Sequence, residues 1–558
     1  MGCSDGVIAM RIRTVVVLAW ATAVLLPLLL AVLQLTSVAE RGIIETLLSL
    51  EARFQTRGAI RFTLVISLLS TLVTVALALP VAWLLGRYRW PGHALLRGLF
   101  TTPFVTPSIL AALGFLSLIE ILEWHRSEEV RLWTLLLAHA WFNMALVIRF
   151  TEPLLSTLDP TLEEAARLLP GGATRWGRMR RFWAPLLAPA LGAAAAMTFA
   201  FSFTSFALVR HLTPGHRNLE VVMANQADWA GIAIPELGRT PSEVVLALSL
   251  VQLLFILSAL GLSNRLSRRA QSLLRGSRTD ARKEAKVWSW GGLHLLLMAA
   301  FTLAPIVAVF VGSFLILEWG ELVFSLAGWE TAFGGIHTGA SLLPALISSL
   351  GYALLTLGVA LPLGWVLAST IVDLEREGRG KAAAAVDLLA MAPLALSAVM
   401  VGLGVLIGLL RTEAEFLRSW WIIAFGHILI TTPFATRVLL PAMRAQDPDL
   451  LAAAALLGAG PIRRLIRVRI PLMRPALIVA AALVLAISLG EFGASWVVVR
   501  FSEWTTLPVM VDDLLSRPGW DPVLRPAAHA AGTVLLLLTM VLFMAVERFR
   551  RLGEGGDF

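Results

Sequence analysis

The sequence predicts an all-α, polytopic membrane protein with about 12 transmembrane helices in two parallel six-helix repeats. Of its 558 residues, 58 % are hydrophobic and only 15 % are charged, and the mean hydropathy is +0.79. Apolar runs long enough to cross about 30 Å of hydrocarbon recur along the chain. The second half also repeats motifs of the first half in the same order. This composition is not that of a soluble globular domain.

Twelve apolar runs are expected to form the spanning helices. Their approximate ranges are 14–36, 62–85, 98–121, 132–150, 186–208, 244–263, 290–312, 342–371, 383–410, 420–440, 476–499 and 526–546. The first run is longer than a usual signal core, which favours a retained helix. Proline removes a backbone hydrogen bond, so prolines inside these runs predict kinks. They are Pro80, Pro103, Pro107, Pro362 and Pro393.

Matched motifs indicate that the two halves are a duplication. The pairs are Ala-Leu-Pro at 78–80 and 360–362, Trp83 and Trp365, Pro103 and Pro393, Gly114 and Gly404, His139 and His427, and Arg149 and Arg437. Their offsets lie between 282 and 290, as expected if short insertions fall in the loops. Because each repeat has an even number of helices, both repeats cross the membrane in the same direction.

Three parts are expected along the chain. Residues 1–263 form the first repeat, with a loop at 159–190, and residues 288–558 form the second repeat, with a loop at 447–476. Between them, residues 264–287 carry many basic side chains and no apolar run, which predicts a cytoplasmic linker.

The formal charge of +9 follows from the topology. Of the 46 Lys and Arg residues, 32 lie in loops on one side of the predicted membrane. The positive-inside rule therefore predicts that both termini and both loops are cytoplasmic in a multi-pass protein of the bacterial inner membrane. The expected partner of this charge is the lipid bilayer, and no nucleic acid is expected.

The loops at 159–190 and 447–476 share one pattern, aligned at an offset of 286. An Ala- and Leu-rich segment is followed by a glycine, a basic segment and a proline-marked entry into the next apolar run. Gly172-Ala173 aligns with Gly458-Ala459, and Pro185 aligns with Pro471. Glycine permits a sharp turn, so each loop is predicted to be a helix-turn-helix on the membrane surface.

At these residues the chain resembles the permease subunits of binding-protein-dependent ABC importers, of the fused double-permease type. The resemblance implies the type I ABC importer permease fold and loops that dock onto an ATPase. The matching positions are Glu164, Ala165, Ala166, Gly172, Ala173, Pro185, Ala453, Ala454, Gly458, Ala459 and Pro471. The first copy has two extra residues near Leu169, and the second has Ala452 in place of the family's glutamate. We therefore expect unequal coupling.

The energy source is expected on another chain. A phosphate-binding loop requires Gly-Lys followed by Ser or Thr, but Lys381 is followed by Ala382 and the chain's other lysines are Lys283 and Lys286. The resemblance therefore implies two copies of a separate ATPase, which binds ATP and Mg, and no cofactor in this chain. It also implies an extracytoplasmic solute-binding protein; the larger outer loops are either its platform or simple connectors.

The helix after each loop supplies the candidate substrate path. Its residues are Ser202, Thr204, Ser205, Phe206, Ser488, Glu491 and Phe492. A carboxylate within a membrane helix is costly and indicates function by default. Beside aromatic rings, Glu491 would suit a cationic solute. The alternative is that it is solvated or paired with an arginine such as Arg500.

No catalytic or metal site is legible. His139 and His427 occupy matched helices, where a lone histidine is more often a hydrogen-bonding group than a metal ligand. The single cysteine, Cys3, excludes an internal disulfide and a cysteine-based metal site. The chain is therefore expected to be a transport subunit without enzymatic activity.

Several segments resemble thiamine permeases most closely. They are LLLAHAWFNMALVIRF, SFTSFALV, SLGEFGASWVV and TTLPVMV. Thiamine, a cationic aromatic, is therefore the expected solute, and ferric iron is the alternative because its permeases share the fused layout. An ion-coupled secondary transporter is a hypothesis from another class, but it would make no use of the repeated loops. A membrane-embedded enzyme would need a polar cluster that the sequence lacks.

Overall fold

The computed structural model describes residues 2–49, 54–158, 160–168, 174–232, 241–274, 282–318, 321–334, 341–411, 419–499, 502–517 and 521–553. Within these ranges the chain is mainly helical, with two short two-stranded sheets. Ten helices are long and apolar enough to cross a membrane, or up to twelve spans if each of two bent helix pairs counts as one. The predicted all-α polytopic fold is confirmed.

The helices group into two compact units. Unit 1 contains Met1–Glu40, Gln226–Leu246 and Ser313–Phe558, and unit 2 contains Arg41–Asn225 and Ala247–Gly312. These units do not coincide with the repeats predicted from the sequence, because the first helix of each repeat belongs to the unit that holds the rest of the other repeat.

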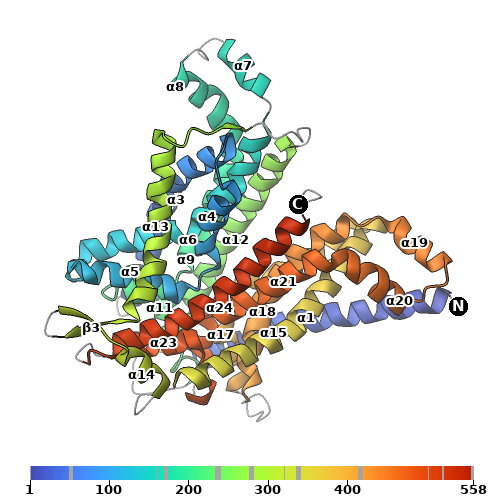
Figure 1. Ribbon diagram of the computed structural model, residues 1–558. Helices are drawn as coiled ribbons and strands as arrows, with labels where there is room; N and C mark the ends of the chain where they lie inside the picture. Colours follow the sequence, from blue (N-terminus) through green and yellow to red (C-terminus); the bar gives the residue numbers. More distant parts are fainter. Residues whose placement is uncertain are drawn as a thin grey trace. The chain divides into compact units, whose positions relative to one another are not determined.

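Unit 2 contains most of the first repeat. Its elements are α2 (Ile43–Leu48), η1 (Phe54–Gly58), α3 (Ala59–Arg87), β1 (Tyr88–Arg89), α4 (His93–Val105), α5 (Ser108–Ile121), η2 (Trp124–Arg126), α6 (Glu128–Thr157), α7 (Pro160–Leu168), α8 (Arg175–Arg178), η3 (Met179–Trp183), α9 (Ala184–Phe203), α10 (Ala207–Leu212), α11 (Leu219–Gln226), most of α12 (Pro241–Leu274), β2 (Lys283–Glu284) and α13 (Trp290–Gly312). In Figure 1, α7 and α8 project beyond the end of the bundle that contains α3 and α12.

Unit 1 contains most of the second repeat. Its elements are α1 (Gly2–Val38), β3 (Leu315–Glu318), β4 (Glu321–Phe324), α14 (Ala327–Gly334), α15 (Leu342–Arg376), α16 (Gly380–Met391), η5 (Ala392–Ala395), α17 (Ala398–Val405), η6 (Leu406–Leu410), α18 (Trp421–Arg444), α19 (Pro448–Leu456), α20 (Pro461–Arg464), η8 (Leu465–Arg469), α21 (Ile470–Gly490), α22 (Gly493–Val498), η9 (Ser502–Trp504), α23 (Leu507–Ser516) and α24 (Leu524–Gly553). Strands β3 and β4 pair antiparallel.

The first helices of the two repeats, α1 and α13, are called the exchanged helices, because each packs in the unit that holds most of the other repeat. Glycines allow them to pack closely. A Cβ atom on Gly408 of η6 would lie 2.1 Å from the carbonyl oxygen of Pro27 in α1. A Cβ atom on Gly114 of α5 would lie 2.3 Å from the carbonyl oxygen of Pro305 in α13. Small residues permit such approach between membrane helices, and only glycine fits here. The first helix of each repeat is therefore held, through its proline, against a glycine-bearing segment of the other repeat.

Two predicted spans are broken. Residues 98–121 form α4 and α5, bent by 101°, and residues 383–410 form α16–η5 and α17–η6, bent by 93°. In the first, Thr106 and Pro107 are extended, because proline disfavours a helical conformation in the residue before it. In the second, Leu396 and Ser397 are extended, and the Ser397 hydroxyl accepts a hydrogen bond from Met400 N at 3.1 Å. The prolines in these runs predicted kinks, but the expectation of one helix per run was wrong, because each run is two helices at a sharp angle.

Other predicted boundaries also differ from the structure. The runs 186–208 and 476–499 each stop early, at Phe203 and Gly490, and resume as α10 and α22. Helix α12 continues to Leu274, so the start of the predicted linker is helical; residues 275–281 lie outside the described residues. Pro80 and Pro362 sit inside helices that continue through them.

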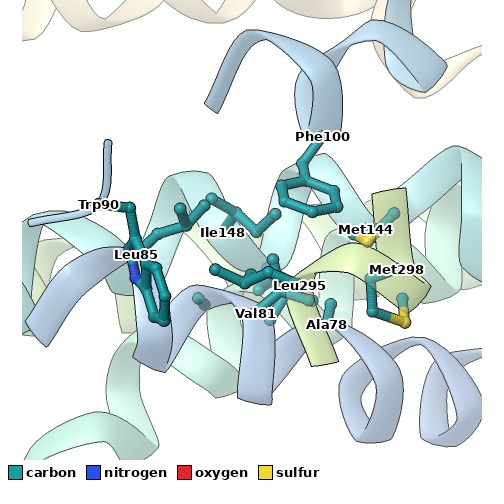
Figure 2. Close-up of a cluster of buried hydrophobic side chains, with 12 residues drawn as sticks. Ala78, Val81, Leu85, Trp90, Phe100, Met144, Ile148, Leu295 and Met298 are labelled. Carbon is teal, nitrogen blue, oxygen red and sulfur yellow. The ribbon is translucent and has the colours of Figure 1, made fainter. Parts of the chain in front are cut away.

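The core of unit 2 lies between α3, α4, α6 and α13. Figure 2 shows the side chains that meet there: Ala78, Val81, Leu85, Trp90, Phe100, Met144, Ile148, Leu295 and Met298. All are buried, and they come from the exchanged helix α13 as well as from the first repeat. The exchanged helix α13 therefore contributes side chains to the core of unit 2.

Replacement of Gly408 by alanine tests the close packing of α1. The added Cβ would overlap the Pro27 carbonyl, so we expect the protein in detergent to lose about 1–3 kcal/mol of stability. Thermal unfolding of the purified chain measures this change. Gly358→Ala is the control, because nothing lies within 4 Å of its Cβ position in α15. Equal melting temperatures for the two variants would contradict the packing argument.

Candidate functional site

The two loops have the same architecture. In the first loop (residues 159–190), α7 is followed by α8 and the π-helical turn η3; in the second (447–476), α19 is followed by α20 and η8. Helices α7 and α19 correspond at an offset of 288, whereas α8 and α20 correspond at 286. The two extra residues of the first copy therefore fall between α7 and α8, where residues 169–173 lie outside the described residues. The second loop is a helix-turn-helix, as predicted, and the first has the same two helical parts.

The turn of the second loop depends on Gly458. Its φ is +78°, in the left-handed region that glycine adopts without strain. Gly458 N donates to Ala455 O and Ala459 N donates to Ala454 O, both at 3.0 Å, which closes the last turn of α19 as a Schellman motif. The predicted role of glycine in the turn is thus visible in this copy. Its counterparts in the first copy, Gly172 and Ala173, lie outside the described residues.

Large apolar side chains stand exposed at matched positions of both loops. Leu168 at the end of α7 is 88 % exposed, and Leu456 at the end of α19 is 90 % exposed. Trp176 of α8 is 75 % exposed, and Ile462 of α20 is 73 % exposed. Single exposed apolar residues are common, but here the same two positions are exposed in each half, so the apolar surface is duplicated along with the loops.

The predicted loop residues surround this surface. Those exposed are Glu164, Ala165, Pro185, Ala453 and Pro471; Ala454 and Ala459 are half-buried, and Ala166 is buried. Small residues beside exposed apolar side chains allow a partner's backbone to come close to the loop.

A buried ion pair anchors the first loop to α3, and the sequence analysis missed it. Glu163 of α7 pairs with Arg87 at the end of α3, and their side chains are 15 % and 5 % exposed. The Arg87 guanidinium also lies 4.9 Å from the Trp183 ring centroid in η3 and donates to Leu155 O at 3.4 Å. One arginine therefore links both parts of the first loop to the helix bundle. An arginine at the end of an apolar run was the available signal.

The second loop is anchored differently. Ser369 and Leu451 stand where Arg87 and Glu163 stand in the first copy, so that ion pair is absent from this half. Arg469 of η8 takes the position of Trp183 and lies 5.4 Å from the Trp365 ring centroid in α15. No residue of α19 is buried. The difference between the loops thus extends beyond Ala452, on which unequal coupling was predicted.

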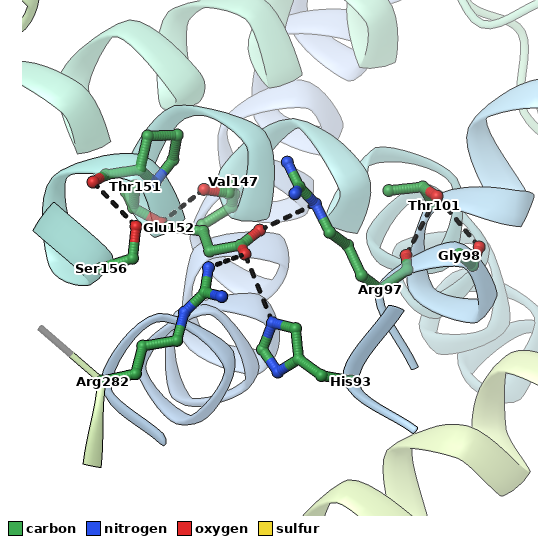
Figure 3. A network of polar contacts seen from close by, with 10 residues as sticks. His93, Arg97, Gly98, Thr101, Val147, Thr151, Glu152, Ser156 and Arg282 are labelled. Carbon is green, nitrogen blue, oxygen red and sulfur yellow. Dashed lines mark hydrogen bonds and ion pairs between the residues drawn. The ribbon is translucent and has the colours of Figure 1, made fainter. Parts of the chain in front are cut away.

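A second buried charge lies near the first loop, on α6. Glu152 is 1 % exposed and faces three basic side chains, as Figure 3 shows. Arg97 of α4 lies 3.2 Å away, Arg282 3.1 Å and His93 3.7 Å. A buried carboxylate needs such partners to remain charged. Arg282 belongs to the predicted linker (264–287), so Glu152 also fixes part of that segment against α6 within unit 2.

The second repeat has an ion pair at the corresponding place, with the acidic and basic residues on exchanged helices. Asp387 of α16, which corresponds to Arg97, lies 3.4 Å from Arg437 of α18. Arg437 matches Arg149, on the same helix as Glu152. In each repeat an ion pair therefore joins the first helix of the bent pair, α4 or α16, to the helix that precedes the loop, α6 or α18.

The candidate substrate-path residues lie where α9 and α21 end. Ser202 is buried and accepts a hydrogen bond from Asn143 Nδ2 at 3.3 Å. Thr204 donates to Ala200 O at 3.1 Å, and Ser205 O accepts from Asn218 Nδ2 at 2.6 Å. The rings of Phe206 and Phe492 are buried. These residues thus lie around matched helix breaks. The hydrogen bonds described here join them to other residues of the chain.

The matched histidines are internal hydrogen-bonding groups. His139 Nδ1 lies 2.7 Å from Ser70 Oγ. His427 Nδ1 and Nε2 lie 2.8 Å from the hydroxyls of Ser488 and Ser495. Within the described ranges, no group of three or more His, Cys, Asp or Glu residues could hold a metal ion.

Glu491 is engaged by its own chain. Its carboxylate accepts hydrogen bonds from Ala494 N at 2.8 Å, from Ser495 N at 2.9 Å and from Ser495 Oγ at 2.7 Å, and lies 3.4 Å from His427 Nε2. It therefore caps the start of α22, where backbone N–H groups lack helical partners. These contacts favour internal pairing over solvation, with His427 as the partner; Arg500 lies outside the described residues.

Comparison with known proteins gives a family match for part of the chain. Residues 78–272 match the model described as "Binding-protein-dependent transport system inner membrane component". This range contains the first loop, the Arg87–Glu163 pair and Glu152.

Curated relatives extend this similarity. The chain is 34 % identical over 164 residues to PhnV of Salmonella paratyphi A, named as a 2-aminoethylphosphonate transport system permease, covering 29 % of this chain and 59 % of PhnV. It is 34 % identical over 163 residues to the sulfate transport system permease protein CysT of Escherichia coli, covering 28 % and 58 %. The chain thus spans less than two thirds of these relatives.

One relative is similar along nearly the whole chain. It is y4fN of Sinorhizobium fredii, named as a probable ABC transporter permease protein and 21 % identical over 561 residues. The alignment covers 96 % of this chain and 95 % of y4fN. A protein of the same overall length therefore exists among transport permeases.

Removal of the Arg87 side-chain charge tests the anchor of the first loop. In Arg87→Met, Glu163 loses its buried partner, so we expect local opening of α7 to become easier by about 2–3 kcal/mol. Hydrogen exchange of the α7 amides in the purified chain measures this. Arg444→Met is the matched control, because its pair with Glu375 is exposed and is expected to contribute less than about 1 kcal/mol. Unchanged exchange of α7 in Arg87→Met would show that the pair is not an anchor.

Proposed function

We propose that this chain is the membrane permease of a binding-protein-dependent ABC importer. An extracytoplasmic binding protein delivers the solute, and two copies of a separate ATPase bind the two loops on the cytoplasmic side. The observation that carries this proposal is the duplicated surface of Leu168, Trp176, Leu456 and Ile462 on two matched helix-turn-helix loops. The family match and the named permeases support the same class.

The contacts of the loops suit them for transmitting movement. A loop that is displaced by a partner can move membrane helices only if it is fixed to them. The first loop is fixed to α3 through Arg87 and continues directly into α9. The second continues into α21, and Arg469 packs on α15. Movement of an ATPase subunit would therefore displace α9 or α21, and these helices end at Thr204 and Glu491.

The solute is the finer part of the proposal. The sequence predicts thiamine, from segments that resemble thiamine permeases and from Glu491, with ferric iron as the alternative because its permeases share the fused layout. The names of PhnV and CysT add a third class, a small oxyanion. We rank the oxyanion first, because the carboxylate that favoured a cation, Glu491, is engaged by Ala494 and Ser495.

Charged substitutions in the loops test ATPase binding. We expect Leu168→Asp or Leu456→Asp to reduce the ATPase that co-purifies with the chain, by about half for either variant and to background for the double variant. A carboxylate would have to be buried against the partner, which costs several kcal/mol. Ile44→Asp is the control, since Ile44 is 73 % exposed on a segment predicted to face the other side. Failure of the wild-type chain to bind any ATPase would overturn the importer proposal and favour ion-coupled transport.

Transport into vesicles tests the solute. The chain, its ATPase and its binding protein are reconstituted, and ATP-dependent uptake of sulfate, 2-aminoethylphosphonate, thiamine and ferric iron is compared. We expect uptake of one oxyanion and none of the other two classes. Uptake of thiamine or iron alone would overturn the ranking while leaving the importer proposal intact. Glu491→Gln is expected to lower uptake through loss of the α22 cap, whatever the solute.

A further inference from the structure

An apolar cavity in unit 2 is lined by residues that belong to neither loop. Its volume is about 810 Å³, and the residues that matter most in its lining are Trp90, Leu96, Trp288, Trp290, Leu293 and Leu296. We propose that it binds an anionic phospholipid, with the acyl chains along α13 and the phosphate held by Lys283 and Lys286. This inference does not depend on the importer proposal.

A short parallel sheet and a glycine pair adjoin the lining residues along the chain. Strand β2 pairs with β1, with Tyr88 opposite Lys283 and Arg89 opposite Glu284, so the chain after α12 returns beside the end of α3. A Cβ atom on Gly292 would lie 2.0 Å from Val287 O, and one on Gly291 would lie 2.9 Å from Leu84 Cδ2. Only glycine allows the chain to fold this tightly over Trp90.

Trp90 forms a fixed wall. Its ring is buried, and its Nε1 donates to Leu84 O at 2.9 Å. Figure 2 shows it beside Leu85 at one end of the core cluster. The cavity wall is therefore part of the folded core and is present before any ligand binds.

The opposite wall is apolar and uncovered. Trp288 is 99 % exposed and Trp290 is 87 % exposed, and Leu293 and Leu296 of α13 are also exposed. They lie where the candidate span Trp290–Gly312 begins. Tryptophan favours the boundary between headgroups and hydrocarbon. The cavity thus opens toward the expected acyl-chain region, which suits a lipid better than a water-soluble ligand.

Two lysines that precede the lining residues in the chain supply the charge for the headgroup. Lys283 and Lys286 are exposed, and Lys286 immediately precedes the lining residue Val287. They are two of the three lysines in the chain; Glu284 between them is the one acidic residue of this segment. The net positive charge favours an anionic phosphate over a zwitterionic headgroup, because basic residues beside a span attract acidic lipids.

Lipid-dependent stability of the purified full-length chain in detergent tests the proposal. We expect phosphatidylglycerol to raise the melting temperature more than phosphatidylcholine does, and inorganic phosphate to have no effect. In Lys283→Gln/Lys286→Gln, the apparent affinity for phosphatidylglycerol should fall about tenfold or more. Trp288→Ala/Trp290→Ala should weaken binding of both lipids. Lys381→Gln, which removes the third lysine from an exposed site in unit 1, should change neither.

The alternatives give distinct results. Equal stabilisation by the two lipids, or an unchanged affinity in the double lysine variant, would overturn the selective anionic site. Stabilisation by inorganic phosphate alone would show that the lysines bind a free anion and that the cavity is not a lipid site. If the tryptophan variant fails to fold, native mass spectrometry of lipid bound to the lysine variant still decides between these outcomes.

Discussion

Hydrocarbon offers no hydrogen-bond partner to a peptide group, so a chain that crosses it must satisfy its backbone internally. This constraint explains why the described residues are mainly helical and why the departures from helix are so specific. The helices break at matched points, at Thr106 and Leu396 and again after Phe203 and Gly490. At the last of these, Glu491 receives the N–H groups of Ala494 and Ser495 that the break would leave without partners. The polar side chain of this apolar segment thus accepts hydrogen bonds from the backbone.

The duplication preserves positions more faithfully than it preserves chemistry. The junction before the loops is held by Arg97 and Glu152 in one repeat and by Asp387 and Arg437 in the other. The Trp83 ring makes an edge-to-face contact with Trp183, whereas the guanidinium of Arg469 lies over the Trp365 ring. Each repeat therefore retains an attractive contact at the same place while its residues differ. Such substitutions produce two halves with matched elements that are held by different contacts.

Patterns within a short stretch of sequence predicted the structure well. Apolar runs predicted the spans, and the offset of 286 predicted two matched helix-turn-helix loops, because both properties depend on neighbouring residues. Prolines predicted kinks within 98–121 and 383–410, but not the sharp bends of 101° and 93°, since hydropathy measures length and not direction. The Arg87–Glu163 pair was also missed, because 76 positions separate its members and either residue alone resembles an ordinary surface charge. Glu491 was recognised as unusual, but its partner on α18 depends on packing that the sequence does not display.

The exchange of first helices also has a consequence in time. Helix α1 is complete once Val38 has been made, but the segment against which Pro27 packs, around Gly408, is synthesised about 370 residues later. At roughly 5–20 residues per second, the segment around Gly408 is made on the order of tens of seconds after α1. During most of its synthesis the nascent chain therefore lacks the segment against which Pro27 packs. Insertion machinery or neighbouring lipids must shelter that helix until the last third of the protein arrives.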